Sequence, residues 1–529
     1  MSRGAPSPFI IENDEDEDQI YTVIGSAKLS ISAPDGVPVT VNGRELYSDV
    51  EQDEEPSFSF VHFKHKSPLT LVLPPDAKAT LTPLPTKLGS RLMPHHMQGF
   101  MEKPHTLPAA AAFPLGRKQF RGVYATEIAV KEGKEESAEV KDNRTAHRWA
   151  KILAESDHFR VPSAQNSLLL RKKPKRPSIA VLGEVGAGKS SMVRILVNTL
   201  LNSADRVLLV DLDVGRPEFA PPGVMSVSII TQDHDTVVGT TEPAVLTGDP
   251  RQFSPALSVC LGDTHIQDCQ LKFIACVQDL ARRAEGLLNE DPAVPIVINT
   301  PGYRQGWGRA EICSALTSFA PTTLALVRRP VAEGEYDHDR AGFAMADSMG
   351  RDVPIVELPA IVGGRRLDPD SNRALHGAAY FLDPRRVNMQ QYATGSLVAC
   401  LREVAPFRVP WIGFDPAIKV IGWNGETPTP VDVLWRIVAL ETSSGVFVGL
   451  GLVRRVITDQ HGRVQLVVAT PADPTTASRL VLTKLEIPIA FHEPYNDQTS
   501  FVSRDVLSGT PVADAKMNKG SALPRKKAG

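Results

Sequence analysis

Cysteine, net charge and long apolar runs are all scarce in this chain of 529 residues. Its five cysteines are odd in number and lack the paired short spacing of a zinc site, so we expect reduced thiols in the cytosol or nucleus. The 58 basic and 61 acidic residues give a net charge of -3, so any nucleic-acid site must be a local patch. The N-terminus is polar and acidic, and no stretch reaches about 18 uninterrupted apolar residues. We therefore expect neither a secretion signal nor a membrane span.

The length and texture of the chain predict several domains, because a chain this long exceeds a single hydrophobic core. Short alternating runs separated by turn signals indicate an all-β module near the N-terminus, and β-rich texture returns near the C-terminus. The stretch between them alternates strands and helices. In chain order we expect a disordered acidic tail (1–19), a β-sandwich-like domain (20–130), a linker with a short helix (131–177), an α/β core (178–405), a β-rich domain (406–500) and a flexible basic tail (501–529).

Within the core, the predicted strands are continuously apolar rather than alternating, which indicates a parallel sheet covered by helices on both faces. They are residues 179–182, 206–211, 296–299, 323–327 and 354–358, and residues 270–288 form an amphipathic helix.

Two stretches outside these elements permit more than one interpretation. His and Met side chains gather between residues 93 and 105, where an incidental cluster in a connecting segment is the stronger interpretation than a soft-metal site. The basic run 171–176 lies directly before the core. It is either a nuclear import signal or part of a nucleic-acid path, or else a solvated linker.

The motif that defines the core is a phosphate loop. An apolar run that can form a buried strand leads into Gly183, and after four residues Gly188-Lys-Ser opens a stretch with helical periodicity. Glycines let consecutive backbone N–H groups point inward at phosphate oxygens, with the helix dipole adding to that field. The predicted ATP phosphate-binding residues are Gly183, Glu184, Val185, Gly186, Ala187, Gly188, Lys189, Ser190 and Ser191. Lys189 would reach the β- and γ-phosphates, and Ser190 would ligate Mg²⁺.

Polar residues at the ends of the next two core strands complete the expected site. Asp213 is the candidate for holding Mg²⁺ or for deprotonating an attacking hydroxyl, with Asp211 as its structural partner. The third strand runs into Thr300, Gly302 and Tyr303, whose hydroxyl, close approach and aromatic face would suit a sugar and base. Tyr303 could equally be an ordinary aromatic residue at the rim.

Taken together, these motifs closely resemble those of the polynucleotide 5′-hydroxyl kinases. The resemblance rests on the phosphate loop, on Asp211-Leu-Asp-Val-Gly-Arg-Pro-Glu-Phe-Ala-Pro-Pro-Gly223 and on Ile298-Asn-Thr-Pro-Gly-Tyr303. The Pro-Glu-Phe and Pro-Pro-Gly part is similar to the nucleolar branch that processes pre-ribosomal RNA, rather than to the branch in the mRNA cleavage factor. The resemblance to the kinase family covers roughly residues 20 to 495. It implies a P-loop core between an N-terminal β-sandwich and a C-terminal β-rich domain.

The resemblance also implies roles for particular residues. Gly183 to Ser191 would bind ATP phosphates and Mg²⁺, Asp213 would activate the RNA 5′-hydroxyl, and Thr300, Gly302 and Tyr303 would hold the substrate end. A lid would contribute Arg373 and Arg366 to neutralise charge on the transferring phosphoryl group, ahead of the aromatic pair Tyr380-Phe381. Without the resemblance, these arginines would be surface residues.

Two departures from the family pattern bear on activity. Arg216 stands where the family usually has Gln and cannot ligate a metal, so either it contacts phosphate or the active site is impaired. The segment 261–268 lacks the Ser-Pro expected after Gly-Asp.

The first hypothesis is therefore an ATP-dependent RNA 5′-hydroxyl kinase of the nucleolus. It would act in pre-rRNA processing together with a spacer endonuclease, on the 5′-hydroxyl end that the nuclease leaves. The alternatives are an ATP-binding scaffold with little turnover and an unrelated P-loop ATPase or GTPase. The absence of an Asn-Lys-x-Asp element disfavours a GTPase.

Overall fold

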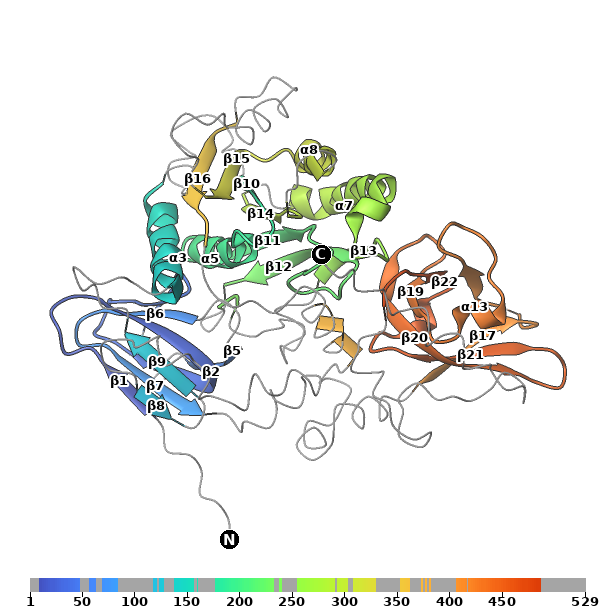
Figure 1. Cartoon of the computed structure of the whole chain (residues 1–529), viewed down its shortest axis with the longest axis horizontal. Coiled ribbons are helices and arrows are strands. Elements are labelled where there is room, and N and C mark those ends of the chain that lie inside the picture. The colour runs from blue at the N-terminus through green and yellow to red at the C-terminus, as the bar shows by residue number, and fades with distance from the viewer. Residues whose placement is uncertain are drawn as a thin grey trace, which may run out of the picture. The chain divides into compact units, whose positions relative to one another are not determined.

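The structure, a computed structural model, divides the chain into two compact units, Met1–Arg385 and Arg386–Gly529 (Figure 1). It describes residues 9–47, 57–62, 69–83, 118–120, 123–127, 138–156, 159, 177–232, 237–239, 255–290, 293–302, 308–329, 353–361, 373, 376–377, 380–381, 406–415 and 417–486. The His and Met cluster and the basic run 171–176 lie outside these ranges. Within them, no helix is both long and apolar enough to cross a membrane.

The N-terminal part of the first unit is a nine-stranded sheet organised around one long strand. That strand, β2 (Gln19–Ser32), pairs with β5, β6, β7 and β9. The two sheets expected of a sandwich are therefore joined through this one strand. The other strands are β1 (Phe9–Glu12), β3 (Val39–Val41), β4 (Arg44–Leu46), β5 (Ser57–His62), β6 (Leu69–Leu73), β7 (Lys78–Pro83), β8 (Lys118–Phe120) and β9 (Val123–Glu127).

Two predictions near the N-terminus are wrong. Residues Phe9–Glu12 belong to the expected disordered tail but pair with β7, because Ile11 is buried in the sheet's apolar core and Asn13 donates its side-chain N–H to Leu73 O. The short helix in the linker, expected over residues 145–155, begins earlier, as α3 spans Ala138–Glu155. The charged residues before position 144 therefore extend the helix instead of forming a loop.

The core of the first unit is a seven-stranded sheet in the order β13-β12-β11-β14-β10-β15-β16. Its strands are β10 (Ser178–Gly183), β11 (Arg206–Asp211), β12 (Val224–Thr231), β13 (Pro255–Cys260), β14 (Ile296–Asn299), β15 (Thr323–Arg328) and β16 (Ile355–Pro359). The five predicted strands are present and parallel. The sheet is mixed rather than fully parallel, because the unpredicted β12 and β13 add antiparallel strands at one edge.

Helices cover both faces of this sheet (Figure 1). This cover is needed because the strands carry apolar side chains on both of their faces. α5 (Lys189–Leu201) and α3 pack on the face formed by Ile179, Val181 and their neighbours. α7 (Gln270–Glu290), which confirms the predicted amphipathic helix, packs with α8 (Gly308–Phe319) on the face that includes Ala180 and Leu182. A 3₁₀ turn, Ile266–Asp268, precedes α7.

The second unit is β-rich, as predicted. Its sheet follows the order β17-β21-β20-β19-β22-β18 and encloses a separate apolar core. The elements are β17 (Phe407–Ile412), β18 (Lys419–Ile421), α13 (Pro430–Val433), β19 (Ile437–Glu441), β20 (Phe447–Thr458), β21 (Val464–Ala469), a 3₁₀ turn (Pro474–Thr476) and β22 (Arg479–Leu482). The apolar run 433–438 indicates a strand, but β19 begins only at Ile437, because the short helix α13, capped by the Thr429 and Asp432 side chains, ends at Val433 and a turn follows it.

Candidate functional site

The predicted phosphate loop lies between β10 and α5, at the carboxyl end of the strand. Its glycines Gly183, Gly186 and Gly188 have φ values of 149°, 87° and 104°, a region closed to most side chains. A Cβ at Gly183 would also lie 2.3 Å from Val327 O on the adjacent strand. Both the backbone conformation and the close approach therefore require glycine at the start of the loop.

Lys189 lies at the start of α5, with its side chain folded back over the loop. It is only 5% exposed, and its Nζ donates a hydrogen bond to Glu184 O at 3.1 Å. The loop closes on itself through Ala187 N to Glu184 O at 3.2 Å. The lysine ammonium thus lies on the loop whose backbone amides would face an anion.

Two apolar residues that the sequence analysis did not single out, Trp149 and Ile361, pack against the phosphate loop. A Cβ at Gly188 would lie 3.0 Å from Trp149 Cη2 and 3.1 Å from Ile361 Cδ1. The Trp149 Nε1 donates to Pro359 O at 3.0 Å, and Ile361 N donates to Ala187 O at 2.9 Å. Trp149 lies on α3, and its hydrogen-bond partner Pro359 lies 210 residues further along the chain, so no local pattern reveals the contact.

The register of the parallel strands aligns the phosphate loop with the acidic segment. Val181 of β10 pairs with Asn299 of β14, and Asn299 pairs with Asp211 of β11. Gly183 and Asp213 each follow two residues after this row, so both lie at the same edge of the sheet. β11 is not the direct neighbour of β10, because β14 lies between them. Two strand spacings separate the rows of β10 and β11 by about 10 Å.

Asp211 organises the segment that carries Asp213. Its Oδ1 accepts hydrogen bonds from Asp213 N at 3.1 Å and Asn299 Nδ2 at 2.9 Å, and its Oδ2 accepts from Glu218 N at 2.5 Å. Burial raises the pKa of Asp211 to about 7, against the lowering effect of these hydrogen bonds. The predicted structural role of Asp211 agrees with these contacts. We call residues 212–218 the acidic loop.

Asp213 is half-buried at the start of the acidic loop. Its Oδ1 accepts from Gly215 N at 3.2 Å. Arg216 follows, donating its backbone N–H to Asp213 O at 3.1 Å. Among the residues that the structure describes, the half-buried Arg216 side chain has no hydrogen bond or ion pair. A carboxylate and an unpaired cation therefore occupy one short turn.

The predicted substrate clasp is brought to the phosphate loop only in part. Gly302 lies against the loop, because a Cβ there would come within 2.3 Å of Val185 Cγ2. Thr300 is fully buried and donates its hydroxyl to Val181 O at 2.7 Å. The prediction that Thr300 contacts substrate is wrong in this structure, since its hydroxyl joins two strands. Tyr303 lies outside the described residues.

Part of the predicted lid is also described. Arg373, His376, Gly377, Tyr380 and Phe381 are helical, and Arg366 lies outside the described residues. The rings of Tyr380 and Phe381 meet edge to face, with centroids 5.3 Å apart at 83°. Arg373 and the aromatic pair therefore all lie at helical positions.

The segment that lacks Ser-Pro forms a turn beside the acidic loop. Leu261 N and Gly262 N both donate to Gly223 O, and the buried Asp263 accepts from His265 N at 2.8 Å. In the described part of the chain, no three His, Cys, Asp or Glu residues gather to hold a metal ion.

Residues 183–376 match the family model described as mRNA cleavage and polyadenylation factor CLP1 P-loop. A Drosophila melanogaster protein named polynucleotide 5'-hydroxyl-kinase NOL9 is 28% identical over 189 residues. That alignment covers 35% of this chain and 18% of the relative. A Schizosaccharomyces pombe protein named polynucleotide 5'-hydroxyl-kinase grc3 is 26% identical over 337 residues, covering 58% of this chain and 43% of the relative. These matches confirm the resemblance, although the chain spans less than half the length of either relative.

A solved structure described as the wild-type Clp1p-Pcf11p (454-563) complex shares the fold. It aligns with a TM-score of 0.51 at 14% identity, covering 91% of this chain and 99% of that one.

Proposed function

We propose that this chain is an ATP-dependent polynucleotide 5′-hydroxyl kinase that transfers the γ-phosphate of ATP to the 5′-hydroxyl of RNA. The row formed by Val181, Asn299 and Asp211 carries the proposal, because it brings a phosphate loop and an acidic loop to one edge of the sheet. The names of the relatives support the same activity.

The chain's own residues divide the chemistry between them. The loop amides and Lys189 would bind the β- and γ-phosphates, while Asp213 would accept the proton of the 5′-hydroxyl as its oxygen attacks the γ-phosphorus. The new O–P bond forms as the bond between the γ-phosphorus and the β,γ-bridging oxygen breaks, leaving ADP. Positioning and charge neutralisation supply most of the rate in such transfers.

The donors present fit a magnesium ion. Ser190 offers a hydroxyl in the first turn of α5, and the half-buried Asp213 offers carboxylate oxygens. These are hard oxygen ligands, and Mg²⁺ is commonly held by one or two such groups together with substrate phosphates. When bound, the ion would neutralise phosphate charge.

The lid and the clasp complete the proposed site. Arg373 and Arg366 would neutralise charge on the transferring group, and Gly302 with Tyr303 would line the entry of the RNA end. For Gly302, the support is its contact with Val185 of the phosphate loop.

The biological setting follows from the family resemblance. We assign the kinase to pre-rRNA processing in the nucleolus, in complex with a spacer endonuclease whose 5′-hydroxyl product it phosphorylates. The relatives named NOL9 and grc3 support this branch.

One observation favours a second function, an ATP-binding scaffold with little turnover. Arg216 stands in the acidic loop where the family usually has Gln. In the kinase proposal its unpaired guanidinium contacts phosphate, and we expect Arg216→Gln to slow transfer about tenfold through loss of a charge-assisted hydrogen bond. A large gain in rate would instead show that the natural site is impaired.

Purified protein with Mg²⁺ and γ-labelled ATP should label a 5′-hydroxyl RNA oligonucleotide. We expect Lys189→Ala and Asp213→Asn each to lower the rate by about 100-fold or more. Lys151→Ala, at an exposed lysine of α3, and Asp205→Asn, at an exposed residue before β11, are matched controls that should retain activity. Wild-type protein that binds ATP but never labels RNA, even with its nuclease partner, would favour the scaffold.

A further inference from the structure

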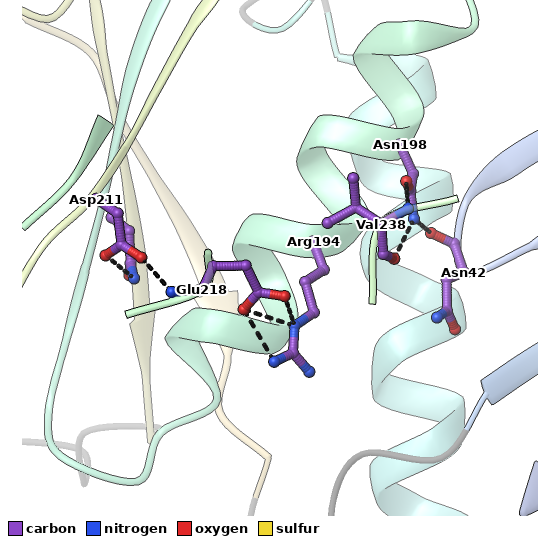
Figure 2. A network of polar contacts seen from close by, with 7 residues as sticks. Asn42, Arg194, Asn198, Asp211, Glu218 and Val238 are labelled. Atoms are coloured by element: carbon purple, nitrogen blue, oxygen red, sulfur yellow. Dashed lines mark hydrogen bonds and ion pairs between the residues drawn. The ribbon is translucent and has the colours of Figure 1, made fainter. Parts of the chain in front are cut away.

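The helix that follows the phosphate loop is joined to the acidic loop by a buried ion pair. Arg194 lies on α5, five residues after Lys189, and Glu218 ends the acidic loop. The Arg194 Nε donates to both carboxylate oxygens of Glu218 at 2.9 and 3.1 Å, and a second nitrogen, Nη2, donates at 2.9 Å. Their side chains are only 13% and 6% exposed. Figure 2 shows the pair bridging the helix and the loop.

The same glutamate also reaches Asp211 through its backbone. Glu218 N donates to Asp211 Oδ2, while Asp213 N donates to Asp211 Oδ1. Both ends of the acidic loop are therefore attached to one carboxylate on β11, and the Glu218 side chain attaches the loop to α5 (Figure 2). Fixed contacts thus lead from Lys189, along α5, to Asp213.

A neighbouring backbone segment holds Arg194 in place. A Cβ on Gly239 would lie 2.8 Å from Arg194 Cδ, and Gly239 has a φ of 88°. The residue before it, Val238, exchanges hydrogen bonds with the Asn198 side chain, one turn further along α5. The aliphatic part of the Arg194 side chain is thus packed against Gly239, while its guanidinium reaches Glu218.

Stability alone does not explain a charged pair at this position. A buried ion pair contributes little beyond what well-packed apolar residues of similar volume provide, whereas its fork geometry fixes direction. Apolar side chains already pack α5 against the sheet. The ion pair adds orientation between two elements that carry the reacting groups.

We propose that Arg194, through Glu218, is a positioning residue that sets Asp213 relative to Lys189 for phosphoryl transfer. This rests on the proposed kinase function. Displacing a catalytic group by about 1 Å lowers rates by roughly 100-fold. Arg194 touches neither substrate nor metal in this account.

The test compares Arg194→Met, Arg194→Lys and the double variant Arg194→Met with Glu218→Leu. We expect Arg194→Met to lower kcat about 10- to 100-fold with ATP affinity changed less than about threefold, and Arg194→Lys to recover only part of kcat. The double variant removes the unpaired buried charge, so its melting temperature should return to the wild-type value while kcat stays low. Arg283→Met, which breaks an arginine–aspartate pair on α7, should leave kcat within about twofold.

A double variant that recovers both melting temperature and kcat would overturn the inference, since the pair would then be structural only. An active wild type with unchanged kcat in Arg194→Met would also overturn it. Wild-type protein that transfers no phosphate would overturn the kinase proposal itself, and this inference with it.

Discussion

The size of single residues at the edge of the central sheet determines how closely its loops approach one another. Gly302 shows this most clearly, because a methyl group there would lie 2.3 Å from Val185 Cγ2 and 3.2 Å from Val185 Cα. The exposed Val185 side chain can rotate away from the methyl group, but the approach to Val185 Cα requires the backbone of the phosphate loop to shift by a few tenths of an ångström. The glycine is required by proximity, since its φ is not in the positive region.

We predict that Gly302→Ala weakens ATP binding about tenfold or more, because the added methyl group displaces Val185 and the loop amides next to it. Titration of a fluorescent ATP analogue measures the change. Gly286→Ala is the matched control, as a Cβ at this helical position on α7 meets nothing within 4 Å. Equal affinities for wild type and Gly302→Ala would mean that the loop is not where the structure places it.

Glu311 in the first turn of α8 makes stability depend on pH. It is 6% exposed, its Oε1 has no hydrogen-bond partner among the described residues, and burial raises its pKa from 4.5 to about 7. The folded state therefore holds a proton that the unfolded state releases at lower pH. Stability contributed by the neutral form is complete below about pH 4.5 and is lost as the pH rises through 7.

Glu311→Gln should raise the melting temperature at pH 7.5 and leave it nearly unchanged at about pH 4, below the pKa values of both states. At pH 7.5 the wild-type carboxylate is charged and buried, at a cost on the order of 3 kcal/mol, which the neutral amide avoids. Calorimetry at the two pH values isolates this group from others that titrate in the same range. A stabilisation of equal size at both pH values would exclude the carboxyl as its origin.

Among the helices, α3 supports the phosphate loop, although it precedes the first strand of the core sheet in the sequence. Its Trp149 is fully buried, touches the Gly188 position and is bonded to Pro359 O. Trp149→Phe keeps an aromatic ring but leaves the part-buried Pro359 carbonyl without this donor. We predict a loss of about 1–3 kcal/mol in unfolding free energy together with weaker ATP binding.

Thermal unfolding with and without ATP measures both effects of Trp149→Phe. ATP-induced stabilisation should shrink, because the loop that binds the phosphates loses its support. Full ATP-induced stabilisation in a destabilised variant would separate α3 from the nucleotide site.

The strands show which parts of the fold can be predicted from sequence. The loop 183–191 is a local pattern, so its strand, turn and helix were all predicted. β12 and β13 were missed because no local signal reveals antiparallel addition at a sheet edge, and residues 9–12 were assigned to a tail because the pairing that buries Ile11 is distant in sequence. In the site, Asp213 belongs to a local motif, whereas the Arg194–Glu218 pair and the Trp149–Pro359 contact depend on tertiary packing.

At the level of the first unit, the turn between β3 and β4 packs the N-terminal sheet against the core. The Asn42-Gly43 turn connects β3 and β4 with φ values of 48° and 84°. A Cβ at Gly43 would lie 3.0 Å from Thr199 Oγ1 on α5. The buried Arg44 donates from Nη1 to Leu201 O and Asn202 Oδ1, both at 2.8 Å, so the turn caps the end of the helix that begins at Lys189.

Asn198 is the centre of this junction, and Figure 2 shows it between Asn42 and Val238. Its Nδ2 donates to Asn42 O and Val238 O, and its Oδ1 accepts from Val238 N. Asn198→Ala should cost about 2–4 kcal/mol, since it leaves buried backbone groups unpaired. Urea unfolding checks this, with Asn289→Ala, at an exposed site on α7, expected to be nearly neutral.

The central claim is that one edge of the core sheet transfers the γ-phosphate of ATP to an RNA 5′-hydroxyl. Its most direct measurement follows ADP and RNA 5′-phosphate in the same reaction, with 5′-hydroxyl RNA and, in parallel, the same RNA already phosphorylated. The account predicts one ADP for each 5′-phosphate formed, and no transfer to the phosphorylated RNA. ADP released equally with both RNAs, without a 5′-phosphate being formed, would contradict it.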